Sequence, residues 1–138
     1  MNNLLSDLED PLVGLPMLTP FDEKDKVDYS SAVYNVEKWN KTKADIFIIG
    51  TASGEELYLS EDEKVNLVST IAGSLEKGKV VCAGIDNPSI SETLRLAENY
   101  EKFGAKLLRI RYPRNESTLR EYFKEVLRFS PLPVLLMH

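Results

Sequence analysis

The chain has 138 residues, of which 43% are hydrophobic and 28% are charged, and this composition predicts one soluble globular domain with a core of its own. Its single cysteine, Cys82, excludes a disulfide framework and a cysteine-rich zinc site, so we expect a reducing, cytoplasmic setting. The 17 Lys and Arg residues against 22 Asp and Glu residues give a net charge of -5, which argues against a nucleic-acid partner.

Residues 1–10 contain no basic residue, so we expect a short N-terminal extension that is neither a secretory leader nor an Arg-rich transit peptide. One domain is predicted over residues 11–138, because no linker or shift in composition divides them. No apolar run approaches the roughly 18 residues that a membrane span needs, and we therefore expect no membrane partner.

Five short apolar runs predict β-strands. Near-continuous apolar character, as in residues 46–49, is typical of a strand that is buried on both faces, and such strands are usually parallel. The five runs are residues 12–18, 45–50, 79–84, 105–110 and 133–137.

Four segments of helical period lie between the strands. Ser60 with Glu63, and Ser89 with Glu92, have the spacing of capping boxes, in which a hydroxyl and a carboxylate bind the first free amides of a helix. Gly78 is interpreted as the C-terminal cap of the helix that begins after Ser60. The other two helices are predicted at residues 29–41 after Asp28 and at residues 118–129 after Ser117.

The alternation of strands and helices with short connections predicts repeated right-handed βαβ units, and hence an α/β fold. The pattern alone is consistent with a doubly wound open sheet or with part of an eightfold barrel. A complete barrel needs about 250 residues, so this chain could supply only about five of its strands. In both architectures the ligand site lies at the carboxyl ends of the strands.

The loop after the second predicted strand is the strongest candidate site. Gly50 and Gly54 bracket Thr51, Ala52 and Ser53, so the backbone can bend sharply and present adjacent amides and hydroxyls to a small anion. The alternative is a glycine-bearing turn with no ligand. The spacing is not that of a phosphate-binding P-loop, a dinucleotide fingerprint or a nucleophile elbow.

Arginines gather at the end of the fourth predicted strand. Alternation places Arg109 and Arg111 on one side of the strand, and Tyr112 and Arg114 follow in the loop. If that side faces a barrel interior, both guanidinium groups need acidic partners or an anionic ligand. The alternative is a pair of surface arginines bound to nearby glutamates.

The remaining candidates are interpreted as structural. His138 is the only histidine and the last residue, so we expect no metal site, no histidine-based triad and no cofactor. Cys82 is interpreted as a small core residue, and Asp86 and Asn87 before Pro88 as turn and cap residues.

Five segments taken together resemble the dihydrodipicolinate synthase and N-acetylneuraminate lyase family. They occur in the order of that family, between residue 11 and residue 138. The Thr19-Pro20-Phe21 segment and the Gly-Thr loop with its Leu59-Ser60 tail are the more specific of them. The segments are residues 14–21, 50–55, 59–63, 81–84 and 132–136.

This resemblance implies a partial TIM (β/α)8 barrel of about five parallel strands and four helices. It also implies a lyase of the class I aldolase type, in which a lysine forms a Schiff base with a 2-oxo acid such as pyruvate. Thr51, Ala52 and Ser53 would then bind the substrate carboxylate, with a hydroxyl from Thr51 or Ser53, and Tyr112 would be the catalytic loop tyrosine. Members of the family are usually oligomers, so we expect a homo-oligomer or association with a full-length relative.

Two departures from the family lead us to expect no Schiff-base activity in this chain. Met137 stands where the family has its proton-relay tyrosine, and the imine-forming lysine of the sixth strand would lie beyond His138. The chain is therefore interpreted as truncated before that lysine. Two alternatives remain at this stage: a non-catalytic half-barrel that binds or assembles, and a flavodoxin-like phosphate-binding module.

Overall fold

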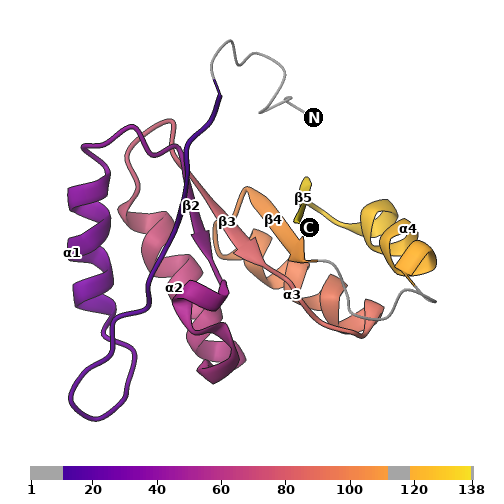
Figure 1. Cartoon of the computed structure of the whole chain (residues 1–138), viewed down its shortest axis with the longest axis horizontal. Helices are drawn as coiled ribbons and strands as arrows, with labels where there is room; N and C mark the ends of the chain where they lie inside the picture. Colours follow the sequence, from indigo (N-terminus) through magenta and orange to yellow (C-terminus); the bar gives the residue numbers. More distant parts are fainter. Residues whose placement is uncertain (1–10, 112–118, 138) are drawn as a thin grey trace.

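Five parallel strands form one sheet in the order of the sequence, β1-β2-β3-β4-β5. The structure is a computed structural model, and it describes residues 11–111 and 119–137 (Figure 1). The strands are β1 Gly14–Pro16, β2 Ile46–Ile49, β3 Val80–Gly84, β4 Leu107–Arg111 and β5 Val134–Met137. The helices are α1 Tyr29–Trp39, α2 Glu61–Ser74, α3 Ile90–Lys102 and α4 Leu119–Phe129.

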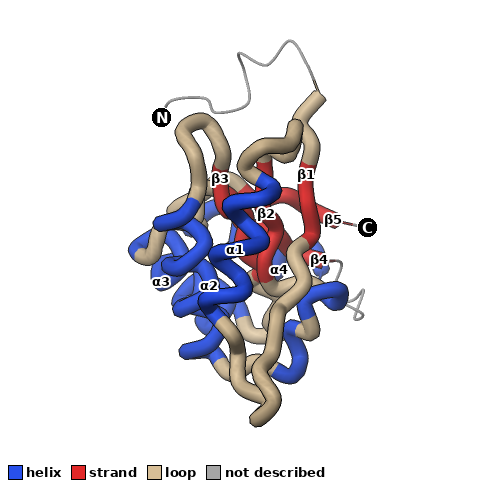
Figure 2. The backbone as a smooth tube through the Cα atoms, turned by 90° about the vertical axis from the view of Figure 1, so that its left-hand side faces the viewer, coloured by secondary structure: helices blue, strands red, loops and turns tan. Residues whose placement is uncertain are grey.

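The strand order decides between the two architectures that the sequence allowed. In a doubly wound sheet the first strand is internal and the order reverses around it, whereas here β1 is an edge strand and every next strand is added on the same side. The sheet is a curled half-barrel, as in a TIM barrel. The partial-barrel prediction is confirmed, and the flavodoxin-like alternative is not favoured. Helices α1, α2 and α3 lie together on one side of the strands (Figure 2).

The predicted helix starts agree with the structure. Asp28 caps α1 by accepting a hydrogen bond from the Ser31 amide, and Ser60 and Glu63 form the predicted capping box of α2. The two Ser30 and Ser31 hydroxyls that bind Asp28 lower the pKa of its carboxyl to about 2. The predicted cap Ser117 of α4 lies outside the described residues, as does the predicted extension over residues 1–10.

One predicted cap is wrong, and one predicted capping box forms only in part. Helix α2 ends at Ser74, because the Asn40 side-chain amide donates to the Ser74 carbonyl, and Gly78, with φ +93°, instead forms the turn before β3. Ser89 accepts from the Glu92 amide at the start of α3, but the Glu92 carboxylate binds Arg95 and does not return to the cap. A guanidinium within reach thus competes with the cap for this carboxylate.

The apolar side chains form two clusters, one on each face of the sheet. The larger cluster lies between the outer face of the sheet and the helices. The smaller cluster lies on the inner face, where Ile46, Cys82 and Leu107 are buried against Leu12 and Leu135. Burial raises the pKa of the Cys82 thiol to about 12, which agrees with its interpretation as a core residue.

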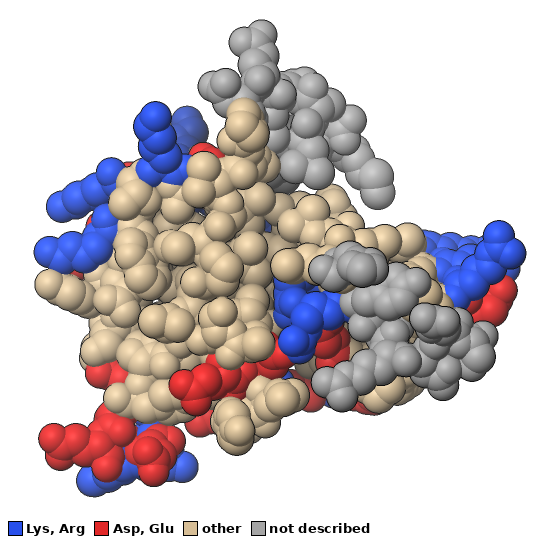
Figure 3. Space-filling model, in the orientation of Figure 1, with Lys and Arg blue, Asp and Glu red and all other residues tan. Residues whose placement is uncertain are grey.

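The buried side chains of the inner face come from three neighbouring strands. The side chains of this face pack against one another across β2, β3 and β4, because the sheet curls around them. Residues other than Lys, Arg, Asp and Glu cover much of the face seen in Figure 3, and acidic and basic residues meet near its lower margin. In the part of the chain that the structure describes, no helix has the length and apolar character needed to cross a membrane.

Candidate functional site

The loops that leave the carboxyl ends of the strands lie close to one another, as both candidate architectures predicted. The Thr19 hydroxyl, which follows β1, donates to the Gly54 carbonyl at 2.7 Å. The Arg109 guanidinium of β4 donates to the Gly50 carbonyl at 2.6 Å. The turn between Gly50 and Gly54 is thus held from a loop on one side and from a strand on the other.

This turn has a defined internal geometry. Gly50 has a positive φ of 70°, and Thr51 is a buried residue whose hydroxyl oxygen accepts from the Gly54 amide at 3.2 Å. Residues 52–54 form a single 3₁₀ turn, after which Glu55 takes a left-handed conformation. The amides of Gly54 and Glu55 donate back to carbonyls of the turn.

The exposed part of the turn offers two amides and a hydroxyl to a ligand. Within the described residues, the amides of Ala52 and Ser53 donate no hydrogen bond, and the Ser53 hydroxyl has no partner either. Both residues are exposed. The three residues that the sequence singled out are therefore contiguous at the mouth of the half-barrel. Thr51 stabilises the turn from inside, while Ala52 and Ser53 face outward from the core.

A charged cluster lies beside the turn. Arg109 is 2% exposed, and its Nη2 also donates to Asp86 Oδ2 at 2.6 Å. Arg111 is half-exposed and binds Asp86 through its amide at 2.5 Å and through Nε at 3.3 Å. Its Nη2 forms an ion pair with the buried Glu56. Two arginines and two acids thus balance one another at the ends of β2, β3 and β4.

The cluster corrects one prediction and refines another. Asp86 is not a turn or cap residue: it is the shared acceptor of both arginines, which follow it by 23 and 25 positions in the sequence. Arg109 faces the interior with an acidic partner, as one alternative held, and the half-exposed Arg111 binds a glutamate, as the other held. Asn87 is a turn residue, as predicted, because its side chain accepts from the amide of Ser89, which is itself the N-cap of α3.

Two atoms of the cluster are buried without a partner among the described residues, Glu56 Oε2 and Arg109 Nε. Sequence reasoning missed Glu56. The available signal was an acid directly after the Gly-Thr turn, together with two arginines on a strand that ends at the same rim. Such unpaired buried groups are costly, and they concentrate at functional sites.

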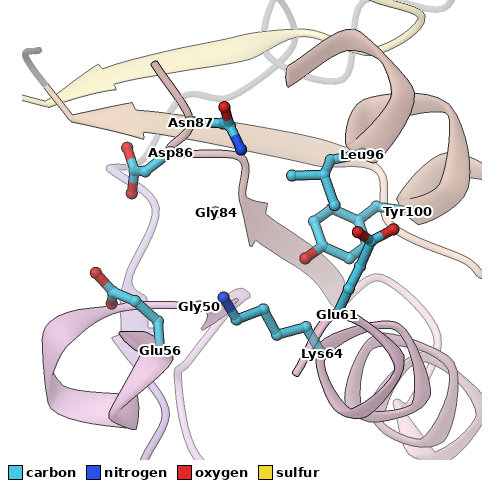
Figure 4. A pocket seen from close by; sticks show the side chains of 9 residues that line it. All are labelled: Gly50, Glu56, Glu61, Lys64, Gly84, Asp86, Asn87, Leu96 and Tyr100. Atoms are coloured by element: carbon cyan, nitrogen blue, oxygen red, sulfur yellow. The ribbon is translucent and has the colours of Figure 1, made fainter. Parts of the chain in front are cut away.

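A cavity of about 150 Å³ lies beside the cluster, between α2 and α3 (Figure 4). Gly50, Gly84 and Asp86 form one wall. The Lys64 amine of α2 and the Tyr100 hydroxyl of α3 point into it. Burial raises the pKa of the Tyr100 hydroxyl. Thr51, Ala52 and Ser53 are not among the lining residues, so the predicted anion turn and the cavity are neighbouring but separate features.

The lysines, Met137 and Tyr112 are the residues that bear on the imine chemistry implied by the resemblance. All eleven lysines fall within the described ranges, and none of them lies on a strand. Met137 lies on β5 in register with Arg111, at the position that the resemblance gives to a proton-relay tyrosine. Tyr112, Arg114 and His138 lie outside the described residues. Over residues 11–111 and 119–137, no three His, Cys, Asp or Glu side chains are grouped so as to hold a metal ion.

Comparison with known proteins gives one consistent sequence match. The model of the dihydrodipicolinate synthetase family matches residues 13–138. The 4-hydroxy-tetrahydrodipicolinate synthase of Heliobacterium modesticaldum is 27% identical over 124 residues, which cover 87% of this chain and 41% of that protein. The protein of the same name from Bacillus subtilis is 24% identical over 128 residues, covering 90% and 44% respectively. The chain thus spans about two fifths of the length of these curated relatives.

Solved structures agree on the fold. Dihydrodipicolinate synthase from Bacillus anthracis superposes with a TM-score of 0.82 at 22% identity, covering 91% of this chain and 44% of that one. N-acetylneuraminate lyase from Mycoplasma synoviae superposes with a TM-score of 0.78 at 22% identity, covering 91% and 45%. At this identity the structural likeness concerns the fold alone.

Proposed function

The chain belongs to the dihydrodipicolinate synthetase family, and from this premise we propose that it carries the carboxylate-binding part of a 2-oxo acid aldolase or lyase. The observation that supports the proposal most directly is the turn over residues 50–54. It combines a buried threonine, two amides without an acceptor among the described residues and a position at the mouth of the half-barrel.

The turn suits a small carboxylate for a simple electrostatic reason. An anion is stabilised by several amide and hydroxyl dipoles that converge on it from a backbone that is already ordered. The Ala52 and Ser53 amides and the Ser53 hydroxyl provide such donors, and Thr51 and Thr19 keep the turn in shape. We assign pyruvate, or a 2-oxo acid like it, as the ligand.

Binding of the carboxylate and formation of the imine need different residues. Aldol cleavage through an imine needs an amine that condenses with the keto carbon, and the imine then accepts the electron pair of the broken bond. No lysine lies on a strand of this chain, and Met137 cannot relay a proton. We therefore propose that the 138 residues bind the acid and do not form the imine. The catalytic role of Tyr112 stays a prediction.

We further propose that the chain acts in a reducing, cytoplasmic compartment and in association, either with itself or with a full-length relative. The observation that favours association is the edge of the sheet at β5. Leu136 and Met137 on this strand are 53% and 47% exposed, and Leu127 and Phe129 of α4 are exposed as well. An unpaired strand edge with exposed apolar side chains is a surface that proteins normally cover.

Binding is tested by titrating purified protein with pyruvate in a calorimeter. The wild type is expected to bind, and Thr51→Val is expected to weaken the affinity about tenfold, because the Gly54 amide loses one of its two acceptors and the turn loosens. Thr70→Val, on α2 and away from the mouth, is the matched control and should bind like the wild type. A wild type that does not bind pyruvate would overturn the proposal.

Imine formation and association are tested separately. Incubation with pyruvate and borohydride followed by intact-mass measurement should leave the mass unchanged, and a stable adduct would contradict the division between binding and chemistry. Light scattering should give a mass above that of one chain. A monomer would contradict self-association. Failure to co-purify with a full-length relative would contradict association with such a relative.

A further inference from the structure

The buried guanidinium of Arg109 occupies an unusual place on the inner face. We propose that Arg109 is a positioning residue that orients the carboxylate-binding turn through the Gly50 carbonyl, an inference that rests on the function proposed above. One nitrogen, Nη2, reaches both the Gly50 carbonyl and the Asp86 carboxylate at 2.6 Å. It therefore joins the loop after β2 to the loop after β3.

The effect on the turn follows from the geometry of the peptide group. A trans peptide is planar, and its carbonyl oxygen and the next amide hydrogen point in opposite directions. Fixing the Gly50 carbonyl on Arg109 therefore fixes the Thr51 amide to point away from Arg109. Because Gly50 has a positive φ and no side chain to restrain it, this peptide would otherwise rotate with little steric cost.

The approach is possible only because residue 84 is a glycine. Gly84 lies in register with Arg109 on the neighbouring strand. A Cβ at this position would overlap the Gly50 carbonyl oxygen and would come within 2.9 Å of Arg109 Nη2. Because Gly84 has no side chain, the Arg109 guanidinium can contact the backbone directly after β2, at the Gly50 carbonyl.

Stability alone gives no reason for an arginine here. The same face is closed at its other end by Ile46, Cys82 and Leu107, and an apolar residue at position 109 would extend that packing. Arg109 instead brings a buried charge whose Nε has no partner in the described part of the chain. Buried ion pairs are weak evidence for stabilisation, since apolar replacements are often as stable.

The positive charge of Arg109 also affects how strongly the Thr51 amide donates a hydrogen bond. A cation that binds a carbonyl polarises the peptide group and makes the amide on its far side a better donor. Asp86 holds the guanidinium in place, since it accepts from Arg109 and also from the amide and side chain of Arg111. The Thr51 amide, like those of Ala52 and Ser53, donates no hydrogen bond within the described residues. The arrangement therefore both orients this amide and strengthens it toward an anion.

The experiment compares pyruvate affinity with folding stability across four variants. Arg109→Met is expected to weaken pyruvate binding at least about tenfold. Arg109→Lys is expected to recover part of the loss, because it restores the positive charge but not the planar guanidinium group. Leu107→Ala, on the same strand and face, destabilises the fold without touching the turn and should bind within about twofold of the wild type. Arg95→Gln removes an exposed guanidinium that pairs with Glu61 and Glu92 and not with the turn, and this variant should also bind normally.

The amide signals of residues 51–53 in ligand-free protein provide a second readout, which separates this inference from the proposed function. They should shift in Arg109→Met and stay in place in Leu107→Ala. If Arg109→Met does not fold, Gly84→Ala serves instead, because it moves the same peptide and keeps the charge. A folded Arg109→Met with unshifted signals and unchanged affinity overturns the positioning role. A wild type that does not bind pyruvate, with the signals shifted as expected, overturns the proposed function alone.

Discussion

At the amino end of the inner face, Ile46, Cys82 and Leu107 pack against one another, whereas two residues further along the same strands Gly84 and Arg109 face one another beside a carboxylate. The apolar end is closed by its own side chains. The polar end contains both buried atoms that lack a partner in the described residues, Glu56 Oε2 and Arg109 Nε. One face of one sheet thus separates a part that stabilises the fold from a part that we propose is arranged for binding.

The largest effect is expected at the apolar end. Leu107→Ala removes a fully buried side chain from the inner cluster, and we expect the free energy of unfolding to fall by about 3 kcal/mol, as for other large-to-small core changes. Urea denaturation measures it. A loss below about 1 kcal/mol would mean that this end is not closed as the structure indicates.

A smaller effect is expected from filling the gap at the polar end. Gly84→Ala places a Cβ against the Gly50 carbonyl, so β2 and β3 must separate, at a cost of about 2 kcal/mol. Gly73→Ala on α2 is the matched control, because no atom lies within 4 Å of the added Cβ. That change should stabilise the helix by about 0.5 kcal/mol. Equal effects of the two substitutions would contradict a steric role for Gly84.

The smallest effect concerns the Cys82 thiol at the apolar end. Cys82→Ser buries a hydroxyl among apolar side chains, and we expect a loss of about 1.5 kcal/mol near neutral pH. The pKa of the folded thiol is about 12 and its ordinary value is 9.0, so the wild type should lose stability as the pH rises through that interval, because only the unfolded thiol ionises.

Serine does not titrate in this interval, and the difference in unfolding free energy between Cys82→Ser and the wild type should therefore narrow from about pH 8 to about pH 11. Urea denaturation at each pH measures the difference. If the difference in unfolding free energy did not change with pH, water would reach Cys82 in the folded protein. The apolar end of the inner face would then be less closed than the contrast with the polar end requires.

Much of the fold follows from local sequence signals. The continuous apolar run Ile46–Ile49 predicts a strand buried on both faces, and Ser60 with Glu63 predicts the start of α2. These succeed because each depends on neighbours within a few residues. The order of the strands did not follow from the pattern alone, and it needed either the family resemblance or the structure.

The candidate site was predicted in part. The turn over Thr51, Ala52 and Ser53 was found because its glycines and hydroxyls are adjacent in the sequence. Asp86 was misinterpreted because its partners, Arg109 and Arg111, lie more than twenty positions away, and only the register of β3 and β4 brings them together. The prediction of Gly78 as a cap was wrong for the same reason, since the side chain that binds the end of α2 is that of Asn40, 34 positions before Ser74.

The central claim is that the turn after β2 binds the carboxylate of a 2-oxo acid. The most direct measurement is a pyruvate titration of isotope-labelled wild-type protein, followed through the backbone amide signals. The account predicts that the Ala52 and Ser53 signals move and saturate together, while those of Lys64 and Tyr100 in the neighbouring cavity stay in place. Saturable shifts confined to Lys64 and Tyr100, with the turn unaffected, would contradict it.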